Sequence, residues 1–139
     1  MPFPYKIKKG LNQKLSEHFS SNEFDCPCDL CADTNIDEDL FTKLEAMRQS
    51  LACSLRIHPG GGYRCDQYQF SLTKRGFETS KGISQHQLGK AADISTGLHS
   101  GEELEKHAKK AGFRAIGVSA NWIHVDVRND KDRFWYYKK

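Results

Sequence analysis

Two short segments carry the side chains best suited to chemistry, and both place a histidine near a carboxylate. SQHQLGKAAD, residues 84–93, contains His86 and Asp93, and WIHVDV, residues 122–127, contains His124 and Asp126. Imidazole nitrogens and carboxylate oxygens are both good ligands for Zn²⁺. The two segments together therefore indicate a candidate metal site.

The second segment alternates polar and apolar side chains, which is typical of a strand with one face in the core. His124 and Asp126 are two residues apart and share the polar face, while the intervening valine and the flanking apolar residues point the other way. The remaining histidines have no such context, and we interpret them as ordinary surface or core residues: His18, His58, His99 and His107. Of these, His107 lies among lysines and is expected to be solvated.

Cysteines form a second candidate metal site. Cys26, Cys28 and Cys31 have C-x-C-x-x-C spacing, and three such thiols can bind a structural metal if Cys65 or a histidine supplies a fourth ligand. Buried free cysteines are the alternative, and we expect Cys53 to pack in the core. No export signal is visible, so we expect reduced thiols and no obligatory disulfide.

A framework of helices and strands has to position these residues. Asp37 precedes apolar residues at helical spacing and predicts a capped helix of about 14 residues. The other expected elements are strands at 54–58, 91–95, 114–118, 122–127 and 134–137, helices at 66–75 and 100–111, and a polar loop at 76–85. This order predicts an α+β domain with a central, mainly antiparallel sheet and flanking helices, covered by an N-terminal segment over residues 1–35.

Length and composition limit the class of protein. The chain has 139 residues, 37% hydrophobic and 28% charged, which predicts one domain over residues 1–139. A net charge of +3 does not require a nucleic-acid partner. No apolar run approaches the roughly 18 residues that cross a bilayer, and the first residues do not resemble a secretory signal. We therefore expect the protein to be made in the cytoplasm and not to insert into a membrane.

Several motifs occur together in a recognisable order. They are FSSNEFDCPC, LEAMR, GGYRC, SQHQLGKAAD, IHVDVR and FWYY. This series covers most of the chain and resembles the zinc D-alanyl-D-alanine carboxypeptidase family, which also includes phage endolysins. The resemblance implies the fold shared with the hedgehog signalling domain, in which an antiparallel sheet carries the metal on one face and helices on the other.

The resemblance also implies roles for individual residues. His86, Asp93 and His124 would bind one catalytic zinc ion and leave a fourth position for water, whose pKa zinc can lower to about 7. Arg64 would hold a substrate carboxylate or the developing oxyanion, with a surface salt bridge as the alternative. Further substrate-binding candidates are Tyr63 and Ser84, the latter with a simple turn role as its alternative.

The chain departs from the family pattern at the expected general base. Many relatives have a carboxylate three residues before the last zinc ligand, where this chain has Asn121, which does not accept a proton at neutral pH. Asp126 is the remaining candidate for a catalytic base, or it orients a metal ligand instead. Gly61 also stands where relatives have a serine.

The function that the resemblance implies is hydrolysis of a peptide bond in the stem or cross-bridge peptides of bacterial peptidoglycan. The enzyme would be a zinc carboxypeptidase or an endolysin-like endopeptidase acting at the cell wall, encoded by a phage or prophage, and monomeric unless part of a virion. One alternative is an inactive zinc-binding structural or peptide-binding module, such as a virion component. A cysteine-based zinc module that contacts nucleic acid ranks last, because the charges are nearly balanced.

Overall fold

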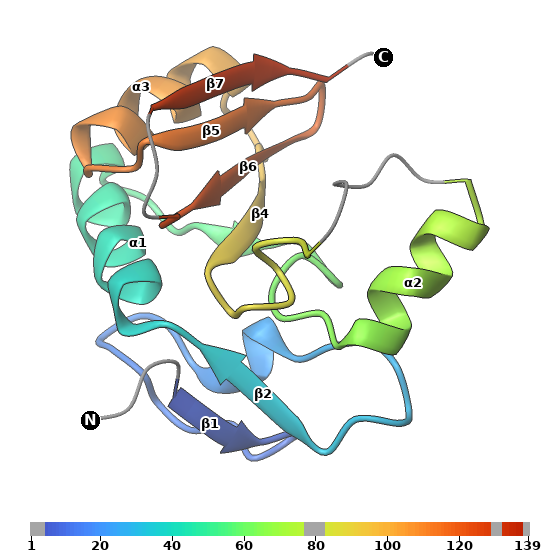
Figure 1. The fold of residues 1–139 in the computed structure, drawn as a ribbon. Helices are drawn as coiled ribbons and strands as arrows, with labels where there is room; N and C mark the ends of the chain where they lie inside the picture. Colours follow the sequence, from blue (N-terminus) through green and yellow to red (C-terminus); the bar gives the residue numbers. More distant parts are fainter. Residues whose placement is uncertain (1–4, 77–82, 129–131, 138–139) are drawn as a thin grey trace.

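The larger of two sheets forms the centre of the protein. A computed structural model describes residues 5–76, 83–128 and 132–137 (Figure 1). The larger sheet has the strand order β3-β4-β6-β5-β7, with bounds β3 Arg56–Ile57, β4 Ala91–Ser95, β5 Ala115–Val118, β6 Trp122–Asp126 and β7 Arg133–Tyr136. Neighbouring strands in this sheet are antiparallel, except that β7 runs parallel to β5. The prediction of a mainly antiparallel sheet in an α+β fold is therefore confirmed.

The register of this sheet separates a polar face from an apolar face. Asp93 of β4 lies opposite His124 of β6, and Gly117 of β5 lies opposite His124 from the other side. The residues next to them point to the other face, where Ile123 and Val125 are completely buried. This alternation places both predicted metal ligands of the sheet on one surface, away from the apolar core.

Two helices cover the apolar face. Helix α1 spans Glu38–Leu51 and helix α3 spans Gly101–Lys110, and both lie on the same side of the sheet (Figure 1). Each begins at a predicted cap: the Asp37 side chain accepts a hydrogen bond from the Asp39 amide, and Ser100 accepts one from the Glu103 amide. The predicted helices are thus confirmed. Among the described residues, no helix is long and apolar enough to cross a membrane.

The N-terminal part of the chain forms a second layer below the large sheet (Figure 1). Strand β1, Tyr5–Lys8, pairs antiparallel with β2, Asp33–Ile36, and a short 3₁₀ helix, η1, covers Ser21–Phe24. The prediction for residues 1–35 missed these two strands, because each has four residues and its partner lies far along the chain. Phe19 and Phe24 are 1% exposed and join this layer to the core.

Helix α2, Asp66–Lys74, lies on the side of the sheet opposite α1 (Figure 1). The turn that follows it in the described chain, residues 83–90, docks on β2. There Gly89 has φ +73° and its carbonyl accepts a hydrogen bond from the Asp37 amide. A Cβ atom at Gly89 would overlap the Asn35 carbonyl. Residues 77–82 of the predicted polar loop lie outside the described residues.

Substitution of Gly89 by alanine is expected to destabilise the protein strongly. The side chain would combine a left-handed backbone with a collision against β2, so we expect a loss of about 3 kcal/mol in the free energy of unfolding. Gly76→Ala is the matched control, since Gly76 has φ +87° but open space around it; it should cost about 1 kcal/mol. Urea unfolding measures both, and equal losses would show that the docking contact contributes nothing.

Candidate metal centre

Three side chains converge on the polar face of the large sheet. His86 comes from the 83–90 turn, Asp93 from the middle of β4 and His124 from the middle of β6. Asp93 Oδ1 lies 3.4 Å from His86 Nε2 and 3.1 Å from His124 Nδ1. Each residue is less than a tenth exposed, and their potential ligand atoms all lie within 4.8 Å of one another. The sheet and the turn thus bring together the three predicted ligands.

Hydrogen bonds fix which nitrogen of each imidazole faces Asp93. His86 Nδ1 is 2.8 Å from the Gly62 carbonyl oxygen, to which it must donate, and this leaves the Nε2 lone pair free. His124 Nε2 is 2.7 Å from Asp126 Oδ2 and donates to it, so Nδ1 is the atom turned toward Asp93. Both rings therefore turn their other nitrogen toward the same oxygen, Asp93 Oδ1. Metal-binding histidines are usually held in this way, with one ring nitrogen hydrogen-bonded and the other facing the metal.

The Asp126 carboxylate is engaged on both oxygens. Oδ2 accepts from His124 and from Arg128 Nη2 at 2.6 Å, and Oδ1 accepts from Arg128 Nε at 2.8 Å and from the Arg128 amide at 3.1 Å. Burial opposes ionisation, but these hydrogen bonds lower the pKa of Asp126 to about 2. The carboxylate is therefore ionised and held against His124. This arrangement favours the orienting role over the role of catalytic base.

Asp93 is a buried anion surrounded by positive partners. Arg64 Nη2 lies 3.0 Å from Asp93 Oδ2, and Arg64 Nε donates to the Gly60 carbonyl at 2.8 Å. Burial alone would raise the pKa of Asp93, but His86 and His124 hold it well below its usual range. The opposite balance holds at His124, where burial lowers the pKa but Asp126 and Asp93 raise it to about 8. The Asp93 carboxylate is therefore ionised, which is the form that binds a metal ion.

The glycine turn before Arg64 packs directly on β4. The Asp93 amide donates to the Gly61 carbonyl at 2.7 Å, and the His58 amide donates to the Asp93 carbonyl at 2.8 Å. A Cβ atom at Gly61 would lie 2.7 Å from the Asp93 Cβ atom. The glycine at the position of the family serine therefore lets this turn approach the metal ligand closely.

The other predicted site residues are placed differently. Ser84 is buried, and its Oγ accepts a hydrogen bond from the His86 amide at 3.2 Å, so it shapes the turn that carries the ligand. The Tyr63 side chain contacts Asn35 of β2, and burial raises the pKa of its phenol. Asn121 is exposed in the turn between β5 and β6, and its carbonyl accepts from Thr96.

Two contributors to the site were not predicted from the sequence. Trp135 of β7 lies beside His124, with 5.4 Å between ring centroids, and Arg128 lies over the Trp135 ring at 5.8 Å. Gly117 makes this possible, because a side chain there would overlap the indole. The FWYY motif predicted only an edge strand. The structure adds that the Trp135 ring of this motif packs against His124.

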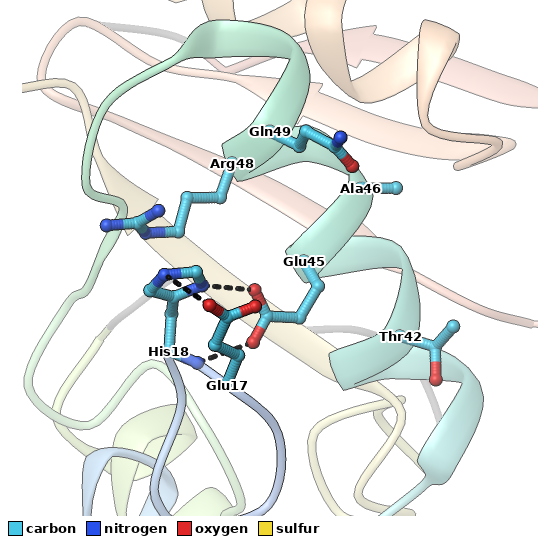
Figure 2. A pocket seen from close by; sticks show the side chains of 7 residues that line it. All are labelled: Glu17, His18, Thr42, Glu45, Ala46, Arg48 and Gln49. Atoms are coloured by element: carbon cyan, nitrogen blue, oxygen red, sulfur yellow. Dashed lines mark hydrogen bonds and ion pairs between the residues drawn. The ribbon is translucent and has the colours of Figure 1, made fainter.

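Histidines outside the centre have other partners. His18 Nδ1 lies 2.8 Å from Glu45 in a surface hollow along α1 (Figure 2). His58 contacts Ser95, His99 contacts Cys53, and His107 contacts Ser50 at 2.7 Å. His107 is therefore not simply solvated, because its hydrogen bond to Ser50 joins α3 to α1. Cys53 is half-buried where it contacts His99, and it does not pack in the core as expected. The remaining cysteines, Cys26, Cys28, Cys31 and Cys65, form a separate cluster beside the start of α2.

The donor set fits zinc. Two imidazole nitrogens and one carboxylate oxygen converge, and each ligand is oriented by a further hydrogen-bonding group, as zinc sites require. Three protein ligands leave a coordination position for water or substrate, as in catalytic zinc sites.

Replacement of Asp126 by asparagine tests the orienting hydrogen bond. The amide keeps the shape but loses the charge that holds His124, so zinc affinity should fall about 10–100-fold. Competition with a chromogenic chelator measures the affinity, and thermal unfolding shows that the variant is folded. Asp132→Asn is the control, because Asp132 is exposed and pairs with Arg114. Equal affinity in both variants would contradict the role of Asp126.

Comparison with known proteins agrees with this geometry. No curated protein matches the chain. Among protein families, Peptidase M15 matches residues 17–126, a range that contains every residue of the metal centre except Arg128 and Trp135, which support it from outside. This match extends over most of the sequence, and the α+β fold is compatible with it. The chain therefore belongs to the peptidase M15 family.

Proposed function

We propose that this protein is a zinc-dependent peptidase that hydrolyses a peptide bond in the stem or cross-bridge peptides of bacterial peptidoglycan. Membership of the peptidase M15 family supports zinc-dependent peptidase chemistry on peptidoglycan in general. The bond cut, in a D-Ala-D-Ala terminus or in a cross-bridge, is the finer part of the proposal.

One observation carries the proposal. His86, Asp93 and His124 converge on one face of the sheet with their remaining polar atoms held by Gly62, Arg64 and Asp126. The two imidazoles turn their second nitrogens toward the same carboxylate oxygen, Asp93 Oδ1, so that two nitrogens and one oxygen surround a single point. When bound by these residues, zinc supplies a Lewis acid that polarises a peptide carbonyl and makes water a stronger nucleophile.

Arg64 is the residue best placed to hold the substrate. Its side chain is 17% exposed, and among the described residues its Nη1 atom makes one long contact, 3.4 Å, to Gln69 Oε1. A guanidinium in this position offers donors to a terminal carboxylate or to a developing oxyanion while Nη2 keeps its contact with Asp93. We infer that Arg64 both positions Asp93 and binds the peptide.

A second candidate function has its own supporting observation. Asn121 stands at the family position of the general base, and both oxygens of Asp126 are engaged. A zinc-binding module that holds a peptide without cutting it, such as a virion component, needs no proton acceptor. The peptidase is preferred because the match to the peptidase M15 family covers most of the chain and Arg64 is placed beside the ligand Asp93 with a partly exposed guanidinium.

The proposal extends to partners and location. The substrate is a peptidoglycan peptide, and the modest positive charge is compatible with an anionic wall polymer and does not require a nucleic-acid partner. We propose a monomer, or a subunit of a virion, that acts at the cell wall and is encoded by a phage or prophage.

Removal of the His86 ring should abolish hydrolysis. We expect the His86→Ala chain to lose zinc from the centre and to leave purified peptidoglycan turbid, whereas the wild type clears it. His107→Ala is the matched control, because the His107 ring hydrogen-bonds to Ser50 between α3 and α1 and belongs to neither candidate metal group. Zinc bound by the wild type without any clearing would reject the peptidase and support the binding module.

Replacement of Arg64 by lysine tests substrate binding. Lysine keeps the charge but loses the planar pair of donors, so kcat/KM on a stem peptide should fall about 100-fold. Zinc content should stay at the wild-type value, which separates this effect from loss of the metal. Arg114→Lys is the control, since Arg114 is an exposed residue paired with Asp132. Unchanged kcat/KM in Arg64→Lys would assign Arg64 to the structural salt bridge alone.

A further inference from the structure

Four cysteines from two separate parts of the chain meet outside the metal centre. Cys26, Cys28 and Cys31 lie between η1 and β2, and Cys65 is the residue that precedes α2. The Cys28 sulfur lies 3.4 Å from those of Cys31 and Cys65, and the Cys26 and Cys65 sulfurs are 3.8 Å apart. All four sulfurs lie within 4.8 Å of one another.

These distances match a single four-coordinate ion. Zinc–sulfur bonds of about 2.3 Å, directed to the corners of a tetrahedron, place the sulfurs about 3.8 Å apart. A disulfide needs a separation of about 2.05 Å, and all four cysteines are free thiols in the structure. The cluster therefore has the spacing of ligands around one ion and not that of two cross-links.

Hydrogen-bond donors surround the cluster. The Cys65 amide lies 3.5 Å from the Cys26 sulfur, and the Lys9 ammonium lies 3.5 Å from the Cys31 sulfur and 4.0 Å from that of Cys28. Lys9 also donates to the Cys28 carbonyl. Four thiolates around a divalent cation carry an excess of negative charge, and donors of this kind stabilise it.

The cluster joins elements that have little structure of their own. A two-stranded sheet and a single 3₁₀ turn are marginal by themselves, and β1, β2 and η1 make up most of the regular structure before α1. On the other side, Cys65 follows Arg64 directly. The amide of Tyr63 donates to the Phe24 carbonyl at 2.8 Å, and the amide of Arg64 donates to the His86 carbonyl at 3.1 Å.

We propose that Cys26, Cys28, Cys31 and Cys65 bind one structural zinc ion that fixes the N-terminal layer to the turn carrying Gly62 and Arg64. Soft thiolates select zinc over the hard cations of the cell. The ion is separate from the histidine centre and does not depend on peptidoglycan hydrolysis. It would act on the centre indirectly, because it holds the turn that orients His86 and contacts Asp93.

Metal counting on the full chain tests the proposal. Protein prepared with reductant and zinc should contain two zinc ions per chain in the wild type, one in His86→Ala and one in Cys31→Ser. Cys53→Ser is the matched control and should keep two, because Cys53 lies outside the cluster and contacts His99. Chelation of the ion left in His86→Ala should lower the melting temperature by on the order of 10 °C.

Cobalt substitution covers the case in which Cys31→Ser does not fold. Cobalt added to the His86→Ala chain should saturate at one ion and give the visible and charge-transfer absorption of a tetrahedral cobalt–thiolate site. No metal in folded His86→Ala, disulfides among the four cysteines, or iron in place of zinc would each overturn the proposal. A wild type with two zinc ions but no clearing of peptidoglycan would reject the proposed peptidase and leave the structural ion established.

Discussion

The buried charge of Asp93 is the constraint on which the rest of the site depends. A carboxylate removed from water destabilises a fold unless positive charges and hydrogen-bond donors surround it. Here the partners come from three separate segments: Arg64 from the glycine turn, His86 from the 83–90 turn and His124 from β6. The fold is therefore completed around Asp93 by groups that also make a cation site. The contacts that stabilise the buried carboxylate of β4 are therefore the same contacts that place the ligands for a metal ion.

Small residues set the distances in this arrangement. Gly61 allows the turn to hydrogen-bond with the backbone of Asp93, and Gly62 packs against Phe24 while its carbonyl orients His86. Gly117 leaves room for Trp135 to lie beside His124. A Cβ atom at any of these positions would overlap a ligand or a segment that packs beside the centre. The glycines thus allow the turn before Arg64 and strand β7 to pack close to the centre.

Local patterns in the sequence predicted the parts of the structure that local interactions determine. The cap at Asp37 with its apolar spacing predicted α1, and the alternation around His124 predicted which face of β6 is polar. Contacts between distant segments were not predictable in this way. The pairing of β1 with β2, the position of Trp135 and the approach of Gly62 to His86 depend on packing across the molecule. The contact of Tyr63 with Asn35 of β2 likewise depends on packing between distant segments.

Asp126 shows where metal binding and hydrolysis place different demands on the same residue. With a pKa of about 2 and both oxygens engaged, it is a weak proton acceptor at neutral pH, and accepting a proton would weaken its hold on His124. A peptidase on this framework therefore needs a proton acceptor other than Asp126, whereas a binding module needs none. The ligand set itself is common to both functions, since it follows from the burial of Asp93. The two functions differ in what they require beyond the ligands, namely a proton acceptor and groups such as the partly exposed guanidinium of Arg64 that hold the substrate during the reaction.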